Sequence, residues 1–366
     1  MAVIKTITCH DVYNPGASLQ AYALMTYLKS LGHEVEIIHY TPDYLRHDRL
    51  LRVDNKRYDR PVVRALYLAA KLPGRLMDRM SQRRRAYDRF TASLPLTRRY
   101  ETYEELLADP PLADVYFAGS DQIWNTAFPN GKDPAFYLDF VPEGRIRASY
   151  AASFATEDVA EEWKPQVRQW LKRMDAISVR ESSGVRIIED FGIPSAVHVC
   201  DPVLLLPRSH WETLAASPLR LEAPYLLVYD FDQNPRIREF CVKAARKNGW
   251  KIYSLLKNDY SDRCFPQAGP LEFLSLVRRA AFVVSNSFHA TVFSLIFEKQ
   301  FAVFRRVEKI NARMEDLTAF LGLESAMEPA FDDYEPVNCA AVQPALCRFV
   351  EHSKAFIDSV LKGIEK

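Results

Sequence analysis

The sequence has no long apolar run and no paired cysteines, and these absences exclude several classes of protein. No stretch of the 366 residues approaches the ~18 consecutive apolar residues of a membrane-spanning helix, so none is expected. The opening residues, Met1–Thr6, lack the basic start and apolar core of a signal peptide. The six cysteines are scattered without a C-x-x-C pair, which argues against a disulfide framework and a zinc cluster. We therefore expect reduced, mostly buried thiols in a cytoplasmic protein.

The chain also has little net charge, +1 in total, but its basic residues are unevenly distributed. The segment from Arg46 to Arg99 carries sixteen Lys and Arg against five Asp, a local charge of +11, with apolar residues between them at roughly helical spacing. We expect a basic helical insertion. It could be a solvated hairpin packed on its own domain, or it could contact the anionic inner face of a membrane. Nucleic acid is not the predicted partner, because aromatic side chains arranged as a stacking platform are missing.

Strand-like and helix-like segments alternate twice along the chain, with the 48% apolar content usual for globular proteins. The first series has strands at 3–9, 34–38, 114–118, 148–155 and 176–179 and helices at 16–31 and 163–174; the second has strands at 225–229, 252–256, 281–284 and 301–304 and helices at 236–248, 271–280 and 290–297. This pattern predicts an α/β fold of two doubly wound, Rossmann-type domains that face an interdomain cleft. The predicted parts are an N-terminal domain at 1–200 with the insertion at 46–99, a C-terminal domain at 201–338, and a final helix at 339–366 that packs back on the N-terminal domain.

The first loop of interest joins the first strand to the first helix. Ligands of doubly wound sheets bind beyond the carboxyl ends of the strands, which is where this loop lies. Asn14 and Gly16 precede a helix whose free N–H groups favour an anion, and Gly16 permits close approach of the backbone. The loop has neither the G-x-G-x-x-G nor the G-K-[ST] pattern, so dinucleotide or ATP binding has little support. A tight turn that requires glycine explains it equally well.

The second loop, Gly119–Asn125, directly follows an apolar strand. Ser120, Gln122 and Trp124 suit the hydroxyls and ring face of a sugar, and Asp121 could act as a general base. The alternative is a helix cap at Asp121, with Trp124 in the core.

The third loop, Ser285–Thr291, lies between a buried strand and an apolar helix. Ser287 can cap that helix, and His289 in its first turn can hold or release a proton near neutral pH. A purely structural histidine is the alternative. Supporting cations at other strand ends are Arg180, Arg305 and Arg313; surface salt bridges are the simpler explanation of each one alone.

At these residues the chain resembles the polysaccharide pyruvyl transferase family. The matching segments are 14–21, 119–125, 149–154 (Ser-Tyr-Ala-Ala-Ser-Phe), 178–181, Asp201-Pro202, 287–290 and the segment around Arg313. The resemblance implies a GT-B-like pair of domains and transfer of pyruvate from phosphoenolpyruvate to a sugar of a glycan, often lipid-linked, to form a ketal in surface polysaccharides. It implies no metal and no cofactor besides the donor.

One departure bears on the donor site. Many members of the family have Arg-x-His-Gly at the site histidine, whereas this chain has Ser287 in place of the arginine and Ala290 in place of the glycine. The resemblance therefore carries the site histidine over to His289 and leaves open which cation binds the donor. Arg180 and Arg313 are the first candidates, and Arg305 is the next.

Together, these observations assign two catalytic residues, His289 as acid and Asp121 as base. The predicted donor-binding residues are Asn14, Gly16, Ser153, Arg180, Ser287, Arg305 and Arg313, and the predicted acceptor-binding residues are Ser120, Gln122 and Trp124. A GT-B glycosyltransferase with a nucleotide-sugar donor and a non-catalytic glycan-binding protein are the alternative functions.

Overall fold

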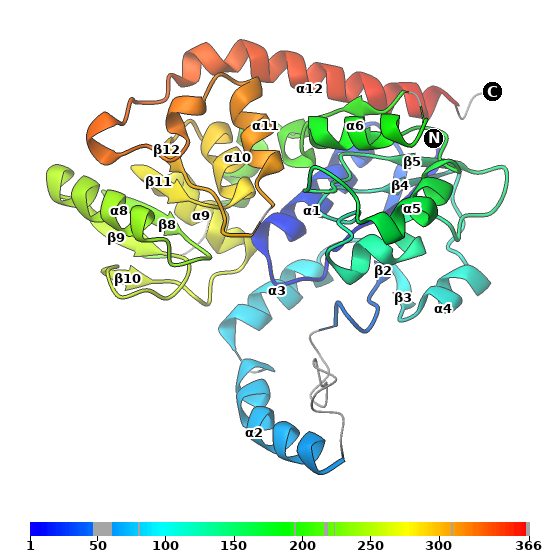
Figure 1. Ribbon diagram of the computed structural model, residues 1–366, viewed down its shortest axis with the longest axis horizontal. Coiled ribbons are helices and arrows are strands. Elements are labelled where there is room, and N and C mark those ends of the chain that lie inside the picture. Colours follow the sequence, from blue (N-terminus) through cyan, green and yellow to red (C-terminus); the bar gives the residue numbers. More distant parts are fainter. Residues whose placement is uncertain are drawn as a thin grey trace.

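The computed structural model describes residues 1–46, 61–79, 81–193, 195–215, 219–222, 224–308 and 310–363. Two α/β halves lie side by side, and the long helix α12 (Cys339–Lys362) runs across both of them (Figure 1). The predicted pair of Rossmann-like domains is confirmed. A hydrogen bond from the Cys200 N–H to Ser353 Oγ, 2.9 Å long, ties α12 to the end of the N-terminal half.

The N-terminal half is built on a five-stranded sheet in the order β3-β2-β1-β4-β5, with every neighbouring pair parallel. Its strands are β1 (Val3–Ile7), β2 (Glu34–Tyr40), β3 (Leu96–Tyr100), β4 (Val115–Ala118) and β5 (Ile146–Ser149). The parallel pairing of β1 with β2 confirms the predicted β-α-β unit. Two short strands, β6 (Ser178–Val179) and β7 (Val197–His198), form a separate parallel pair linked to this sheet by single bridges such as Ala148 to Ala176.

The C-terminal half repeats this order with its own strands, β10-β9-β8-β11-β12. These are β8 (Tyr225–Tyr229), β9 (Lys251–Ser254), β10 (Arg263–Cys264), β11 (Phe282–Ser285) and β12 (Gln300–Val303). In each sheet, the strand order runs one way from the first strand of that half and the other way from the fourth, so the order switches between β1 and β4 and between β8 and β11. Ligands of such folds bind beyond the carboxyl ends of the strands at this switch point, and each half has one switch point.

Helices cover both faces of the two sheets (Figure 1). The exception is α2 (Pro61–Arg79), which projects from the body. The other helices before α12 are α1 (Pro15–Ser30), α3 (Gln82–Ala92), α4 (Tyr103–Ala108), α5 (Lys164–Leu171), α6 (Ser182–Asp190), α7 (Arg208–Leu214), α8 (Pro235–Asn248), α9 (Pro270–Arg279), α10 (Phe288–Ile296) and α11 (Ala312–Phe320). Short 3₁₀ helices lie at Pro129–Lys132, Pro134–Tyr137, Glu161–Trp163, Pro202–Leu205, Glu324–Ala326 and Phe331–Asp333. Gly32 and Gly249, which follow α1 and α8, have the left-handed φ values of 88° and 67° that the sequence predicts for helix ends.

One hydrophobic core runs through both halves. It joins β1 and α1 of the N-terminal half, through the Pro202–Leu205 turn, to α9, α10 and α12. Two further apolar clusters fill the other faces of the two sheets. Because the shared core is continuous, the loops at the two switch points are held in a fixed relation to one another.

Several predicted boundaries are wrong. The first strand ends at Ile7 rather than at residue 9, and the strand predicted for 148–155 ends at Ser149. Beyond it the backbone is left-handed at Ala151, whose N–H donates to Ser178 Oγ, and at Ala155, whose N–H donates with that of Phe154 to the buried Glu181 carboxylate. Predicted elements of the C-terminal half are confirmed to within two residues.

The basic insertion is only in part helical. Helices α2 and α3 confirm that prediction for 61–79 and 82–92, but the end of the segment is the edge strand β3, whose Tyr100 pairs with Tyr40 of β2. Residues 47–60 and 80, which belong to the predicted insertion, lie outside the described residues. Across the described ranges, no helix has the length and apolar character that a membrane crossing needs.

All six cysteines are free. Cys9, Cys200 and Cys241 are buried, whereas Cys264 and Cys339 are half-buried and Cys347 is exposed.

Candidate active site

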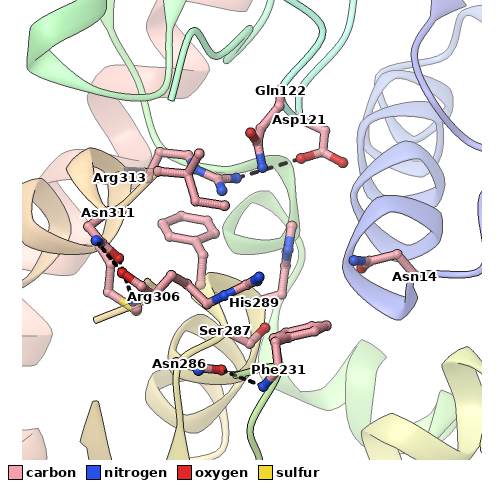
Figure 2. Close-up of a pocket in the computed structure, with 13 residues that line it drawn as sticks. Asn14, Asp121, Gln122, Phe231, Asn286, Ser287, His289, Arg306, Asn311 and Arg313 are labelled. Atoms are coloured by element: carbon pink, nitrogen blue, oxygen red, sulfur yellow. Dashed lines mark hydrogen bonds and ion pairs between the residues drawn. The ribbon is translucent and has the colours of Figure 1, made fainter. Parts of the chain in front are cut away.

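A cavity of about 120 Å³ lies where the two switch points face each other (Figure 2). The N-terminal half contributes the loops after β1 and β4, and the C-terminal half contributes those after β8, β11 and β12. The lining residues are Asn14, Asp121, Gln122, Phe231, Asn286, Ser287, Phe288, His289, Arg306, Ile310, Asn311, Arg313 and Met314. The structure therefore brings together Asn14, Asp121, Gln122, Ser287, His289 and Arg313 of the predicted site residues.

Helix α1 begins against the imidazole of His289. The Asn14 side chain caps the helix by accepting hydrogen bonds from the N–H groups of Gly16 (2.9 Å) and Ala17 (3.3 Å). A Cβ atom on residue 16 would lie 2.0 Å from His289 Nδ1, so only glycine fits there. The close approach predicted at Gly16 is thus an approach to His289, and the Gly16 N–H is already taken by Asn14.

Helix α10 places His289 in its first turn. Ser287 caps it, with Oγ accepting from the Ala290 N–H at 3.4 Å. His289 is 7% exposed and lines the cavity. The N-terminal ends of α1 and α10, both of which favour negative charge, therefore meet at one imidazole.

Behind His289 lies a fully buried carboxylate, Asp201. Its Oδ2 is 3.4 Å from His289 Nε2 and 2.6 Å from Arg180 Nη1, and its Oδ1 accepts from the Val203 N–H at 3.1 Å. Burial raises the pKa of Asp201, but the charges and hydrogen bonds of His289 and Arg180 lower it by more, so the net pKa is well below the usual value. Asp201 is therefore ionised at neutral pH.

Asp121 is a half-buried carboxylate held between two arginines. Its Oδ1 lies 3.4 Å from Arg180 Nη2 and 3.6 Å from Arg313 Nη1. Its φ of 78° is a left-handed conformation that aspartate adopts more readily than most residues. Burial raises the pKa of this carboxyl, but Arg180, His289 and Arg313 outweigh that effect, and the pKa is below its usual value.

The two guanidinium groups retain free donors. Among the described residues, Nε of Arg180 and Nε of Arg313 have no hydrogen-bond partner. Both groups lie over the Phe288 ring, with Cζ at 4.8 Å for Arg180 and 5.6 Å for Arg313. Burial, together with the neighbouring Arg180 charge, lowers the pKa of Arg313 to about 10, which still leaves it charged at pH 7. Arg313 lines the cavity and its guanidinium can bind an anion that enters it, whereas Arg180 lies outside the lining and pairs with Asp121 and Asp201.

Arg305 lies away from the cavity, and its neighbour Arg306 lines it. Arg305 makes exposed ion pairs with Glu315 (2.6 Å) and Glu328 (2.5 Å). Arg306 is held by Asp232, with Nε 3.0 Å from Oδ2, and its Cζ lies 4.5 Å from the Phe231 ring centroid. Consecutive side chains after a strand point in different directions, and the sequence does not show which of the two faces the ligand.

Five predicted site residues are buried outside the cavity lining: Gly16 and Arg180, described above, and Ser120, Trp124 and Ser153. Trp124 has no exposed surface: it stacks on Tyr137 and donates from Nε1 to the Phe136 carbonyl, so its ring cannot contact a sugar, and the alternative core placement is correct. Ser120 Oγ faces Asp201 Oδ2 at 3.4 Å. Ser153 Oγ donates to the buried Glu181 carboxylate at 3.0 Å. These two serines support the network behind the cavity.

The sequence analysis missed the loop after β8. Asn286 accepts from the Phe231 N–H (3.1 Å) and donates to Asp230 (3.0 Å) and Asp232 (3.2 Å), which joins this loop to the one after β11. The sequence does contain a signal for this loop, because the mostly polar run at 230–234 begins at the carboxyl end of a predicted strand. Asp201 was noted only as part of a family motif. No group of three or more His, Cys, Asp and Glu side chains in the described ranges is arranged to hold a metal ion.

Comparisons with known proteins agree with this geometry. The sequence model of the family described as "Polysaccharide pyruvyl transferase" matches residues 14–306. No curated protein matches the chain in sequence. The UDP-GlcNAc 2-epimerase of Methanocaldococcus jannaschii has a similar fold, with a TM-score of 0.50 and 13% identity over 95% of this chain and 92% of that one. UGT89C1 of Arabidopsis thaliana has a TM-score of 0.49 and 10% identity over 99% of both chains. The two Rossmann-like halves, together with the likeness to the epimerase, give the fold as the GT-B type.

Proposed function

Because the chain belongs to the polysaccharide pyruvyl transferase family, we propose that it moves the pyruvyl group of phosphoenolpyruvate onto a sugar of a lipid-linked glycan. The product is a pyruvate ketal in a capsule or exopolysaccharide precursor, and no cofactor besides the donor takes part. The observation that carries the proposal is a small cavity lined by His289 together with two guanidinium groups, Arg306 and Arg313.

The size and charge of the cavity suit this donor. Phosphoenolpyruvate has a phosphate and a carboxylate, which arginine binds in two-pronged geometry. Arg306 and Arg313 line the cavity, and the ends of α1 and α10 add their partial positive charge. At about 120 Å³ the cavity is below the roughly 300–1,000 Å³ of pockets for drug-sized ligands. This supports a three-carbon phosphate over a nucleotide sugar as the donor.

The chemistry requires proton transfers at three places. The methylene carbon of the enol gains a proton and becomes a methyl group, which makes the central carbon electrophilic. One sugar hydroxyl bonds to that carbon and loses its proton. The bond from the carbon to the phosphate oxygen then breaks, and a second hydroxyl closes the ketal and loses its proton. Of the two protons released, one balances the methyl group and the other leaves with phosphate.

We assign the acid role to His289. It lines the cavity, and its Nε2 lies 3.4 Å from Oδ2 of the buried Asp201, which orients the imidazole. Arg180, which shares Asp201 with His289, keeps this carboxylate in place. A positioned acid or base of this kind typically contributes a factor of 10²–10⁴ to the rate.

Asp121 is proposed as the base toward the acceptor hydroxyl, with Gln122 beside it as an acceptor-binding residue. In the chain without donor, Arg180 and Arg313 hold the pKa of Asp121 low, which makes it a weak base. A donor anion that pairs with Arg313 weakens that hold and strengthens Asp121 as a base. In the chain without donor, the Asp121 carboxylate thus holds part of the positive charge that the donor anion pairs with when it binds.

The direct test is the release of phosphate from phosphoenolpyruvate in the presence of candidate lipid-linked oligosaccharides. We expect acceptor-dependent release, and a loss of at least a hundredfold in the His289→Gln variant with an unchanged melting temperature. Near-normal turnover in that variant would remove His289 from the mechanism.

A thermal-shift comparison of phosphoenolpyruvate with UDP-sugars separates the donors, because a ligand that binds the folded chain raises its melting temperature. Stabilisation by the UDP-sugar alone would assign a glycosyltransferase. Binding of saccharide with no response to either donor would assign a non-catalytic glycan-binding protein.

A further inference from the structure

Helix α2 projects from the body of the molecule, below the N-terminal sheet in the view of Figure 1. It has 19 residues, and none of its described side chains is buried. Leu66 is 68% exposed and Val63 is 38% exposed. By contrast, the next helix, α3, buries Tyr87 and Phe90 against the body. Within the described residues, the basic segment therefore packs on its own domain through the part that follows α2 and through Arg46, whose Nη1 lies 2.6 Å from Glu101 Oε2.

The exposed side chains of α2 are sorted by polarity. At 3.6 residues per turn, Arg64 and Lys71 lie on one side of the helix. Exposed apolar residues, namely Val63, Ala65, Leu66, Ala69 and Ala70, spread over the opposite side. Contiguous exposed apolar surface on a folded protein marks a contact site. A helix with an apolar side and a cationic side, and with low net hydrophobicity, is typical of segments that lie in a membrane interface.

The charge of α2 indicates which kind of partner covers its exposed apolar side. The helix has four Lys and Arg against one Asp, and the whole segment from Arg46 to Arg99 has a charge of +11. Clusters of basic residues beside apolar ones are attracted to the anionic lipids of a cytoplasmic leaflet. A second protein with an acidic groove would need its own apolar floor, whereas a lipid surface supplies both components at once.

The insertion is also connected to the cavity. Arg83, in the first turn of α3, donates from Nη2 to the Tyr13 carbonyl at 2.7 Å, and Tyr13 and Tyr87 are in ring contact at 5.3 Å. Tyr13 precedes Asn14, the cap of α1 that lines the cavity. The helix that follows α2 in the sequence is therefore in contact with the loop that leads into the cavity.

We propose that α2 binds an anionic phospholipid surface, with its apolar side among the lipid head groups and acyl boundary. This inference stands apart from the proposed pyruvyl transfer, since it depends on α2 and not on the cavity. In this proposal, α2 lies at the surface of the bilayer and does not cross it.

Vesicle flotation of the full chain tests the proposal. We expect recovery with phosphatidylcholine vesicles that contain phosphatidylglycerol, and at least fivefold less with phosphatidylcholine alone. Leu66→Asp and the Arg64→Glu/Lys71→Glu pair should each reduce flotation at least fivefold without a change in melting temperature. Leu112→Asp is the matched control, because Leu112 is 77% exposed and lies outside the basic segment.

Three results would overturn the proposal. The first is equal recovery with both kinds of vesicle, and the second is equal recovery of wild type and Leu66→Asp. The third is a concentration-dependent dimer without lipid, seen by analytical ultracentrifugation and lost in Leu66→Asp, which would assign this side of α2 to a second copy of the chain.

Discussion

Gly16 and His289, which are 273 positions apart in the sequence, are in contact so close that no side chain can stand between them: a Cβ on residue 16 would be 2.0 Å from Nδ1. The contact joins the first turn of α1 to the first turn of α10. It therefore fixes the imidazole with respect to both halves of the molecule.

Replacing Gly16 with alanine should displace the imidazole. We expect at least a hundredfold loss of kcat/KM, because small displacements of a catalytic group have large effects on rate. Overpacking of this kind costs about 1–3 kcal/mol of unfolding free energy. Kinetics and urea unfolding measure both effects. The control is Gly74→Ala, whose new Cβ would meet nothing within 4 Å. Wild-type kinetics in Gly16→Ala would show that this contact has no part in catalysis.

Arg305 and Arg306 form a natural matched pair for the donor site. Arg306 lines the cavity, so Arg306→Gln should weaken donor binding at least tenfold. Arg305 lies outside the cavity lining, so Arg305→Gln should change donor binding less than twofold. Its exposed ion pairs contribute only about 0–1 kcal/mol to stability, so the variant should also stay folded. Isothermal titration with phosphoenolpyruvate gives both dissociation constants. The reverse ranking of the two variants would contradict the assignment.

Asp121→Asn should bind the donor more tightly and turn it over more slowly. The substitution removes the carboxylate that competes with the donor for Arg313, while it also removes the proposed base. We expect a lower dissociation constant for phosphoenolpyruvate together with a 10²–10⁴-fold lower kcat.

A purely structural role for Asp121 predicts that binding and turnover both become worse. Asp259→Asn controls for the change in net charge, since Asp259 is an exposed carboxylate paired with Arg238. Unchanged affinity in Asp121→Asn would show that no such competition takes place.

Asp201 should make the stability of the chain sensitive to acid. Its folded-state pKa is lowered below that of the unfolded chain, which is about 3.9 for aspartate. Its stabilising contribution is therefore fully present above about pH 4 and is lost as the pH falls through the folded pKa. We expect the unfolding free energy to decrease below pH 4, with a slope that is shallower in Asp201→Asn by up to about 1.4 kcal/mol per pH unit.

The same variant should be less stable at neutral pH by about 3–5 kcal/mol, because Arg180 would lose its buried partner. Urea unfolding between pH 3 and pH 7 measures both quantities. Parallel pH profiles of the variant and the wild type would contradict the role of Asp201 as a titrating group of the folded state.

Much of the fold could be predicted because its signals are local. Tyr225–Tyr229 is predicted to the residue, since a short apolar run between turns has few alternatives. Ala148–Ala155 is different, because Ala and Ser have no strong preference and its left-handed positions depend on contacts with the distant Ser178 and Glu181 side chains. No pattern within the segment itself contains that information.

For the candidate site, too, the features with local signals could be predicted, and those that depend on contacts between distant residues could not. The rule that ligands bind beyond strand ends predicts that Asp121 and His289 lie at one site, and both line the cavity. The rule does not say which way a side chain turns, so Trp124 was assigned to the acceptor although its ring is in the core. Likewise, the pairing of Asp201 with His289 joins residues that are 88 positions apart, and it follows only from how the chain is packed.

The repeated strand order of the two sheets has a consequence for engineering. Each half supplies one side of the cavity and neither supplies a complete set of charges: Asp121, Arg180 and Asp201 precede β8, whereas His289, Arg306 and Arg313 follow it. A chimera that combined one half with the corresponding half of another GT-B enzyme would bring together charges that do not match. New acceptor preferences in this chain are therefore best sought by substitutions within its own loops, and not by exchange of domains.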